Sequence, residues 1–328
     1  MKQRMIISRT PLRITFVGGG TDIREFYTRD SPGAVLSASI NKYIYITVNK
    51  KFDNQIRISY STTEIVDKVD MIKHPTVREA LRFLDIDGGI EIVSISDIPS
   101  FGTGMGSSST FLVGLLHALH AYRGEYVSSR EMAEEAVKIE REILREPGGK
   151  QDQYMAAYGG IQLMKFYRDE TVSIEPLVTS EEIRETLEKN LLLLYTGIQR
   201  SSADIHRKQA GSVQSRLDEY RKMREIALQL FDDLSRGNAD RMGTMLHENW
   251  KLKKRLADGI SSDSVDHLYD QAMRLGATGG KLIGAGGGGF LLLYAPHEIH
   301  NNIVNDLGLK RQDFRFDYQG SRIIFVGE

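Results

Sequence analysis

Apolar positions alternate with polar ones over much of the first hundred residues, which is the spacing of strands that bury one face. The runs with this spacing or with β-branched residues are RMIIS, LRITFV, AVLSASI, YIYITVNK, QIRISYS and GIEIVSI. One segment, TVREALRFL, has helical spacing instead. The first hundred residues are therefore predicted to be rich in strands.

Helical spacing becomes frequent after residue 110. It predicts a helix over 110–122 and a second helix that begins at a capping box of Ser128 with Glu131 and runs to about Leu144. A short helix is predicted over 152–158. The runs GGIQLMKFY and TVSIEPL then have the pattern of two strands of a hairpin.

Helices dominate the remainder of the chain. SEEIRETLEKN, most of 202–258 and SVDHLYDQAMRLG have helical spacing, while LLLLYTG is typical of a buried strand. The change of pattern between Phe166 and Ser180 indicates a boundary. We expect an N-terminal domain of residues 1–175 and a C-terminal domain of residues 176–328, each with strands and helices.

Composition excludes several classes of function. The 328 residues are 41% hydrophobic, enough for a substantial core. With 43 basic and 44 acidic residues the formal net charge is −1, so no overall field attracts nucleic acid or an anionic membrane. The basic run KLKKRL is expected to lie on a solvated helix face.

The chain has no cysteine, which excludes disulfides, thiolate metal ligands and a cysteine nucleophile. No apolar run reaches membrane-spanning length, and the first residues lack the features of a signal peptide. We therefore expect a soluble cytoplasmic protein that binds neither nucleic acid nor membrane.

The segment DIPSFGTGMGSSST, residues 97–110, joins a predicted strand to a predicted helix and places three glycines before three serines. Glycines let backbone N–H groups turn inward, and a helix N-terminus adds unpaired N–H groups, so the pattern suits a bound phosphate. It is not a P-loop, because no Lys-Ser or Lys-Thr follows the last glycine, and its G-x-G-x-G spacing is not a dinucleotide fingerprint. Taken alone, it fits a flexible linker equally well.

Two other glycine-rich segments also leave alternatives open. Residues 18–22, GGGTD, follow an apolar strand, which implies close approach of the backbone to a ligand or to another strand. Residues 284–289 match G-x-G-x-x-G, but they lead into the strand-like FLLLYA rather than into a helix. Residues 284–289 therefore form either a phosphate-binding loop or a turn.

Glu140 and Asp152 are the candidate acidic groups. A carboxylate with a serine hydroxyl is a common way to hold Mg²⁺ beside nucleotide phosphates, and a nearby aspartate can accept a proton from a hydroxyl. Each also has a structural interpretation, since Glu140 has Arg141 and Arg145 as neighbours and Asp152 can cap the short helix. Neither H-E-x-x-H nor G-x-S-x-G occurs, so zinc and serine hydrolases have no support.

Together and in this order, the three glycine-rich segments resemble the motifs of the GHMP kinase superfamily, named for galacto-, homoserine, mevalonate and phosphomevalonate kinases. The similarity lies in PLRITFVGGGTD at 11–22, in 99–110, where GMGSSS stands for G-L-G-S-S-A, and in IGAGGGGF at 283–290. It covers nearly the whole chain. Met105 for leucine and Ser109 for alanine are small departures in a loop that acts mainly through its backbone.

The resemblance implies an α+β, two-domain fold with a ribosomal protein S5 domain 2-like N-terminal domain and a ferredoxin-like C-terminal domain, with the site between them. It implies a transferase, a kinase that uses ATP and Mg²⁺. Asp152 matches the catalytic aspartate, Arg13 the basic residue beside it, and Ser108 with Glu140 the metal ligands. The positions implied to hold ATP are Pro99, Gly102, Gly104, Met105, Gly106, Ser107, Ser108 and Ser109. Those implied to hold the substrate are Gly18, Gly19, Gly20, Thr21, Asp22, Gly284, Gly286 and Gly287. Arg200 and Lys281 are candidates for a distal phosphate by charge alone.

Within the superfamily, PLRITFVGGGTDI, EPGGKQDQYMAAYGGI and YTGIQRSS are most similar to the kinases that phosphorylate the anomeric (C1) hydroxyl of D-glycero-D-manno-heptose 7-phosphate for nucleotide-activated heptose synthesis. A sugar or sugar-phosphate substrate is implied, with a homodimer as a possible assembly. The alternatives are a kinase of the same superfamily for fucose, galactose or mevalonate, and a non-catalytic ligand sensor. The joint presence of Arg13, Ser108, Glu140 and Asp152 counts against a sensor.

Overall fold

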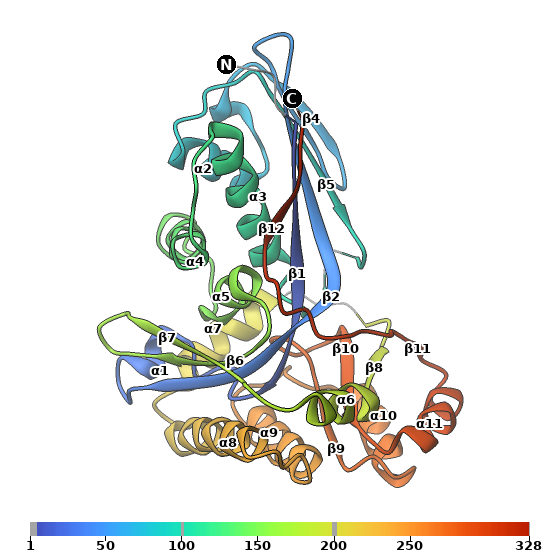
Figure 1. Cartoon of the computed structure of the whole chain (residues 1–328). Coiled ribbons are helices and arrows are strands. Elements are labelled where there is room, and N and C mark those ends of the chain that lie inside the picture. Colours follow the sequence, from blue (N-terminus) through green and yellow to red (C-terminus); the bar gives the residue numbers. More distant parts are fainter. Residues whose placement is uncertain (1–4, 100–101, 199–201, 328) are drawn as a thin grey trace.

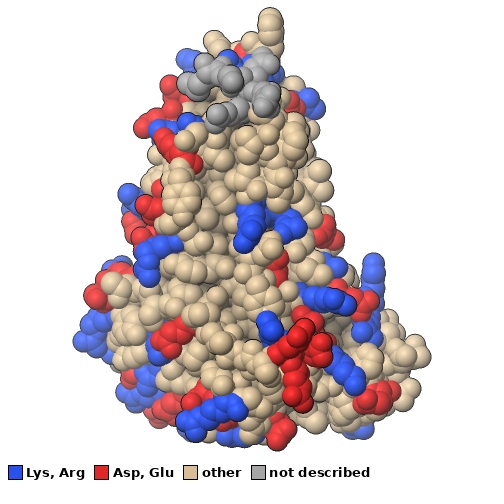
Figure 2. All heavy atoms as spheres, in the orientation of Figure 1, with Lys and Arg blue, Asp and Glu red and all other residues tan. Residues whose placement is uncertain are grey.

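The computed structural model describes residues 5–99, 102–198 and 202–327 of the chain. Within these residues the strands form two separate sheets, and helices lie beside and between them (Figure 1). Basic and acidic side chains are intermingled over the face shown in Figure 2, as the near-zero net charge leads one to expect.

Among the described residues, the first sheet has eight strands: six follow the order β12-β1-β2-β5-β3-β4, while β6 pairs with β2 and β7 pairs with β6. The second strand, β2, pairs with β6 through residues 33–38 and with β5 through 44–50, while β1 runs along its other edge. The strands are β1 (Ile6–Val17), β2 (Gly33–Lys50), β3 (Ile56–Ser59), β4 (Thr63–Val66), β5 (Ile90–Ser96), β6 (Ile161–Phe166), β7 (Val172–Pro176) and β12 (Arg322–Val326).

Each of the two long strands joins two runs that the sequence pattern separates. Strand β1 passes through Pro11, and its register with β2 shifts between Pro11 and Leu12. Such a bulge tolerates proline, which has no backbone N–H to donate to the hydrogen bonds between the strands. Strand β2 joins AVLSASI to YIYITVNK without a break. The later part of β1 is buried almost throughout, because α3, α5, α8 and α9 all pack on it.

The helices of the first half gather beside β1 and β2 (Figure 1). The capping box of Ser128 and Glu131 is confirmed, and the helix that it starts changes at residue 138 from an α-helix to one π-helical turn, η2. Such turns are frequent at functional sites, and this one carries Glu140. The helices of the first half are α1 (Arg24–Tyr27), η1 (Val69–Met71), α2 (Pro75–Phe83), α3 (Ser107–Arg123), α4 (Ser129–Val137), η2 (Lys138–Ile143) and α5 (Gln151–Tyr158).

In the described chain, the second sheet has four antiparallel strands in the order β11-β8-β10-β9. Numbered along the chain this order is 4-1-3-2, which is that of a ferredoxin-like sheet, as predicted. The strands are β8 (Leu191–Tyr195), β9 (Gly279–Leu282), β10 (Phe290–Tyr294) and β11 (Lys310–Arg311). The helices around them are α6 (Glu181–Asn190), α7 (Ser202–Ser212), α8 (Leu217–Ser235), α9 (Met242–Lys254), α10 (Asp263–Arg274), η3 (His297–Ile299) and α11 (His300–Leu307).

The end of the chain returns to the first sheet. Strand β12 pairs with β1, with Ile6 opposite Val326 and Arg9 opposite Arg322. One strand from the predicted C-terminal domain therefore completes the N-terminal sheet, and a single cut in the sequence does not separate the two sheets. The division into residues 1–175 and 176–328 stays a prediction.

Candidate active site

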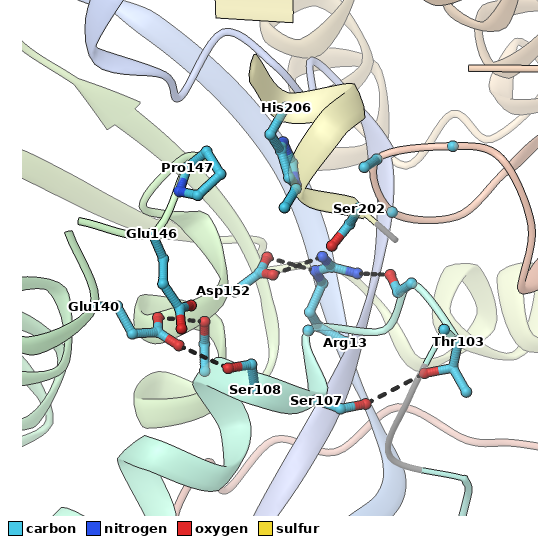
Figure 3. Close-up of a pocket in the computed structure, with 18 of the residues that line it drawn as sticks. Arg13, Thr103, Ser107, Ser108, Glu140, Glu146, Pro147, Asp152, Ser202 and His206 are labelled. Carbon is cyan, nitrogen blue, oxygen red and sulfur yellow. Dashed lines mark hydrogen bonds and ion pairs between the residues drawn. The ribbon is translucent and has the colours of Figure 1, made fainter. Parts of the chain in front are cut away.

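Two cavities meet where the halves of the chain come together. The larger, of about 460 Å³, is lined by Arg13 and by residues from segments 102–109, 140–152, 202–206 and 284–288 (Figure 3). The smaller, of about 50 Å³, shares part of that lining and adds the first glycine segment. The residues common to both are Arg13, Arg141, Asp152, His206, Gly284 and Ala285.

The first wall of the large cavity is the loop 102–106 and the start of α3. Gly102, Gly104 and Gly106 have φ of +72°, +73° and +75°, in the left-handed region that favours glycine. Helix α3 begins directly after Gly106, so the unpaired N–H groups of its first turn lie at the cavity. The segment is thus a built loop rather than a linker, and it suits an anion.

The third glycine segment packs directly on this loop. A Cβ on Gly104 would overlap the carbonyl oxygen of Ile283, and one on Gly284 would lie against the backbone of Gly104. Gly284 and Gly286 line the large cavity, whereas Gly287 donates its N–H to the carbonyl oxygen of Ile260 outside it. Close contact between the two loops is the reason for glycine here.

Two positions implied to hold ATP lie away from the cavity wall. Met105 is fully buried, and its carbonyl oxygen accepts from the N–H of Arg13 at 3.2 Å, so it fastens the loop to β1. Pro99 is exposed and does not line the cavity. The contribution of Met105 to the loop is structural.

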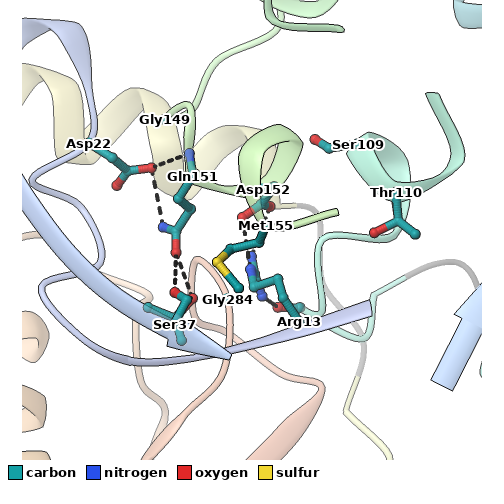
Figure 4. Close-up of polar contacts among 12 residues, drawn as sticks. Arg13, Asp22, Ser37, Ser109, Thr110, Gly149, Gln151, Asp152, Met155 and Gly284 are labelled. Carbon is teal, nitrogen blue, oxygen red and sulfur yellow. Dashed lines mark hydrogen bonds and ion pairs between the residues drawn. The ribbon is translucent and has the colours of Figure 1, made fainter. Parts of the chain in front are cut away.

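Arg13 and Asp152 form a bidentate ion pair at the junction of the two cavities (Figures 3 and 4). The Nε and Nη2 atoms of Arg13 each donate to one carboxylate oxygen of Asp152 at 2.8 Å, and Nη1 donates to the carbonyl oxygen of Gly104 at 2.5 Å. The side chain of Arg13 is 6% exposed and that of Asp152 is 21% exposed. Asp152 does not cap α5, so the structural alternative for this residue is wrong.

Glu140 lies beside the start of α3 and is 1% exposed. One carboxylate oxygen accepts from the hydroxyl of Ser108 at 3.1 Å, and the other accepts from Ser109 at 2.7 Å and from the side chain of Gln153. The nearest arginine nitrogen, of Arg141, is 3.8 Å away. Glu140 therefore has the predicted ion pair with Arg141, but its shorter contacts are those with Ser108 and Ser109.

The residues around Glu140 fit a magnesium ion. Magnesium binds through one or two carboxylates and a hydroxyl and takes its other ligands from phosphates and water. Within the described residues no group of three or more acidic or histidine side chains could hold a metal. Burial raises the pKa of Glu146, which also lines the cavity, and the nearby charge of Glu140 raises it further. A cation would relieve this concentration of negative charge.

Replacing Glu140 with glutamine is expected to weaken Mg²⁺ binding by about 10- to 100-fold, because a neutral amide is a poor ligand for a hard cation. Calorimetric titration of Mg²⁺ into the enzyme with ADP measures this without turnover. Glu142→Gln, at an exposed glutamate two residues away, is the matched control. Equal Mg²⁺ affinity in both variants would remove Glu140 from the metal site.

The smaller cavity has a network of polar side chains around Gln151 (Figure 4). Asp22 accepts from the N–H of Gly20 at 3.0 Å and from the side chain of Gln151 at 3.2 Å. The amide oxygen of Gln151 in turn accepts from Thr15 at 2.6 Å and from Ser37 at 3.2 Å. Asp22 is thereby held in one orientation with its carboxylate at the cavity.

The other residues of the first glycine segment divide into two groups. Gly19 and Gly20 line the small cavity. Gly18 and Thr21 do not line it. Gly18 packs against the carbonyl oxygen of Ala34, and the hydroxyl of Thr21 forms hydrogen bonds with the backbone N–H and C=O of Ala34. The predicted close approach to another strand is confirmed at Gly18, while Gly19 and Gly20 face a cavity and their contact with a ligand stays a prediction.

Of the two candidates chosen by charge, only Lys281 can be placed in the described structure. Lys281 lies on β9, is 0% exposed and does not line either cavity. Arg200 lies outside the described residues. The structure instead brings His206, Lys253 and Arg141 to the cavities, none of which the sequence motifs single out. Arg141 donates to the carbonyl oxygens of Glu146 and Gly149 at 3.0 Å and so fixes the loop before Asp152.

Comparison with known proteins gives the family. A model described as GHMP kinases N terminal domain matches residues 71–160, and one described as GHMP kinases C terminal matches residues 230–307. A protein from Campylobacter jejuni named D-glycero-alpha-D-manno-heptose 7-phosphate kinase is 31% identical over 97% of this chain and 98% of its own length. The chain belongs to the GHMP kinase family.

Two further relatives extend the comparison of this GHMP kinase. The solved structure of a D-glycero-D-manno-heptose 1-phosphate kinase from Bacteroides thetaiotaomicron covers 98% of the chain and 100% of its own, with a TM-score of 0.81 and 24% identity. An L-fucokinase/L-fucose-1-P guanylyltransferase from Bacteroides fragilis is 26% identical over 89% of the chain but only 35% of its own length. The predicted two-domain GHMP kinase fold is confirmed.

Membership of the GHMP kinases makes the chain an enzyme that transfers a phosphoryl group to a hydroxyl. Members of the family use ATP as the donor, generally with Mg²⁺. Across the ranges that the structure describes, no helix combines the length and the apolar character needed to cross a membrane.

Proposed function

We propose that this chain transfers the γ-phosphoryl group of ATP to the anomeric hydroxyl of D-glycero-D-manno-heptose 7-phosphate, which gives the 1,7-bisphosphate. The observation that carries the proposal is the position of Asp152, at the junction of a phosphate-binding loop and a cavity lined by Asp22. The name of the Campylobacter relative supports heptose 7-phosphate as the substrate. The similarity of the motifs supports C1 as the position that is phosphorylated. Cytoplasmic location and a homodimer stay predictions.

The large cavity suits ATP. Phosphoryl transfer depends on in-line positioning and on neutralising spread negative charge, and the first turn of α3 offers N–H groups and the positive end of its dipole. Ser108 and Glu140 would hold Mg²⁺, which when bound supplies further positive charge beside the phosphates. The triphosphate would then end beside Arg13 and Asp152.

The small cavity suits the acceptor sugar. Asp22 would accept hydrogen bonds from sugar hydroxyls, while Asp152 would take the proton of the reacting one. As the proton passes to the Asp152 carboxylate, the anomeric oxygen forms a bond to the γ-phosphorus and the bond to the β-phosphate oxygen breaks, which releases ADP. Arg13 holds the carboxylate in a fixed orientation through two hydrogen bonds. An anomeric hydroxyl is more acidic than an ordinary alcohol, so positioning matters more than basicity.

A panel of acceptors tests the proposal by ADP release. Heptose 7-phosphate is expected to give the highest kcat/KM, and the unphosphorylated heptose, fucose and galactose are expected to be poorer. Phosphorus NMR of the product then distinguishes a phosphate on C1 from one elsewhere. Equal rates with and without the distal phosphate would contradict the heptose-phosphate assignment, and preference for fucose would favour the function named for the Bacteroides fragilis relative.

A further inference from the structure

Lys253 is a buried cation at the small cavity. It lies near the end of α9 and is 4% exposed, although the sequence pattern assigns the run KLKKRL to a solvated face. For Lys253 that prediction is wrong, whereas Lys251 and Arg255 are exposed. The ammonium group donates one hydrogen bond, to the carbonyl oxygen of Gly284 at 2.5 Å. An ammonium group has three donors, so two are left for the cavity.

His206 approaches the same cavity from α7 (Figure 3). Its Nδ1 is buried and has no hydrogen-bond partner among the residues that the structure describes. Burial lowers the pKa of His206 to about 4, and the charge of Lys253 adds to this effect. The ring is therefore neutral near pH 7, with one nitrogen that donates and one that accepts. An unpaired polar atom in a residue that lines the cavity is a candidate partner for a ligand.

The charges and the size of the cavity define the kind of ligand. Three cations, Arg13, Arg141 and Lys253, and two carboxylates, Asp22 and Asp152, line the small cavity. Arg13 is paired with Asp152, and Arg141 donates to the carbonyl oxygens of Glu146 and Gly149. A free phosphate would meet two carboxylates there, whereas an uncharged hydroxyl can donate to a carboxylate and accept from an ammonium group at once. A volume of about 50 Å³ has room for a few water-sized groups. It matches the hydroxyls along one edge of a sugar.

We propose that Lys253 and His206 bind the hydroxyl groups of the sugar beside the reacting one, with Lys253 donating to an oxygen whose proton is directed at Asp22. The inference rests on the proposed function only in requiring a sugar acceptor. It does not depend on which sugar that is. It also implies that a distal phosphate lies outside the small cavity, because Lys253 and His206 bind hydroxyl groups rather than that phosphate.

The variant Lys253→Met tests this role, with Lys251→Met on the exposed side of the same helix as the matched control. Hydrogen bonds to a charged group are strong enough that their loss raises the KM for the sugar by about 10- to 150-fold. The kcat and the KM for ATP are expected to stay within about threefold, because the contact exists before and during transfer. The melting temperature should not fall, since the change removes a buried charge.

The comparison of two acceptors separates hydroxyl binding from phosphate binding. If Lys253 binds hydroxyls, the variant raises the KM for heptose 7-phosphate and for unphosphorylated heptose by the same factor. A rise confined to the phosphorylated sugar would overturn the inference, as would an unchanged KM for both. The panel of acceptors is first measured with the wild-type protein and identifies the preferred sugar. A failure of the proposed function is therefore distinguished from a failure of the inference about Lys253. If fucose or galactose is preferred, the same variants are measured with that sugar.

A pH profile gives a second test. Burial and then the charge of Arg13 on β1 lower the pKa of Lys253 to about 8, against Asp22 and Asp152, which act to raise it. Arg141 of η2, His206 of α7 and Lys281 of β9 are the other charged or titratable groups nearby. Because the free enzyme loses this ammonium above pH 8, kcat/KM for the sugar is expected to fall there. The fall should be absent in Lys253→Met, and its persistence would contradict the assignment.

His206→Asn is the companion variant, at a residue that touches no proposed metal ligand in the described contacts. It is expected to raise the KM for the sugar by about tenfold, because a neutral hydrogen bond contributes less than a charged one. Calorimetric titration of the sugar without nucleotide provides the same comparison independently of turnover. Wild-type sugar affinity in both His206→Asn and Lys253→Met would refute the proposal.

Discussion

Replacing Asp152 with asparagine is expected to lower kcat by about 10²–10⁴-fold, the range typical of a lost general base, while ATP affinity stays close to that of the wild type. The amide has nearly the shape of the carboxylate but cannot take a proton from the sugar hydroxyl. The nucleotide contacts are expected to survive, because they come from the loop 102–109 and from Glu140 rather than from Asp152. Single-turnover kinetics and ADP titration measure the two quantities separately.

The chain offers a matched control for this change. Asp30 accepts from Arg221 and Arg224 at 2.6 Å and is 17% exposed, so its surroundings resemble those of Asp152, but it lines neither of the two cavities. Asp30→Asn should leave kcat within about twofold, since only an ion pair remote from the site is lost. Full activity in Asp152→Asn, or an equal loss in both variants, would remove Asp152 from the mechanism.

The predicted residues that the structure brings to the large cavity lie in short continuous segments. Gly104 and Ser108 could be predicted because a loop followed by a helix sets its own geometry through glycine φ angles and the helix start. The roles of Glu140 and Asp152 came from the family resemblance. The pairing of Arg13 with Asp152 spans 139 residues and came from the family resemblance, since no periodicity predicts which strand meets which helix.

Two of the residues that the sequence missed, His206 and Lys253, lie on helices of the second half, whereas Arg141 lies on η2. The helical spacing of KLKKRL shows that one side is polar but does not single out the lysine that turns inward. A signal was nevertheless present: Lys253 follows Leu246 and Trp250 and precedes Leu256 at three- and four-residue intervals, so it interrupts a buried apolar stripe. A cation at such a position requires a partner.

Lys281 was predicted to bind the distal phosphate from its charge alone, but it lines neither cavity. Lys281 pairs with Leu292 in a strand of a sheet whose neighbours are apolar, and its ammonium nitrogen has no hydrogen-bond partner within the described parts of the chain. Burial lowers its pKa well below the ordinary value. Alternation along the short strand GGKL is too brief to reveal that this side chain faces the interior.

Replacing Arg13 with methionine is expected to lower kcat by about 10²–10³-fold, the loss seen when one donor to developing charge is removed. Unlike Asp152→Asn, this change should also weaken ATP binding, because Nη1 of Arg13 holds the carbonyl oxygen of Gly104 in the phosphate loop. The free energy of unfolding should fall by about 1–3 kcal/mol, since Asp152 is left without its partner. Arg224→Met, which breaks the ion pair with Asp30, is the matched control.

The double variant Arg13→Met with Asp152→Asn separates the role of the pair in catalysis from its role in stability. If the two residues act as one unit, the double variant is no slower than the slower single variant by more than about threefold. Its free energy of unfolding should exceed that of Arg13→Met, because the unpaired carboxylate is gone. Losses in kcat that multiply would show instead that Arg13 acts on the nucleotide and Asp152 on the sugar independently. Stopped-flow turnover and chemical denaturation of the four proteins decide between these outcomes.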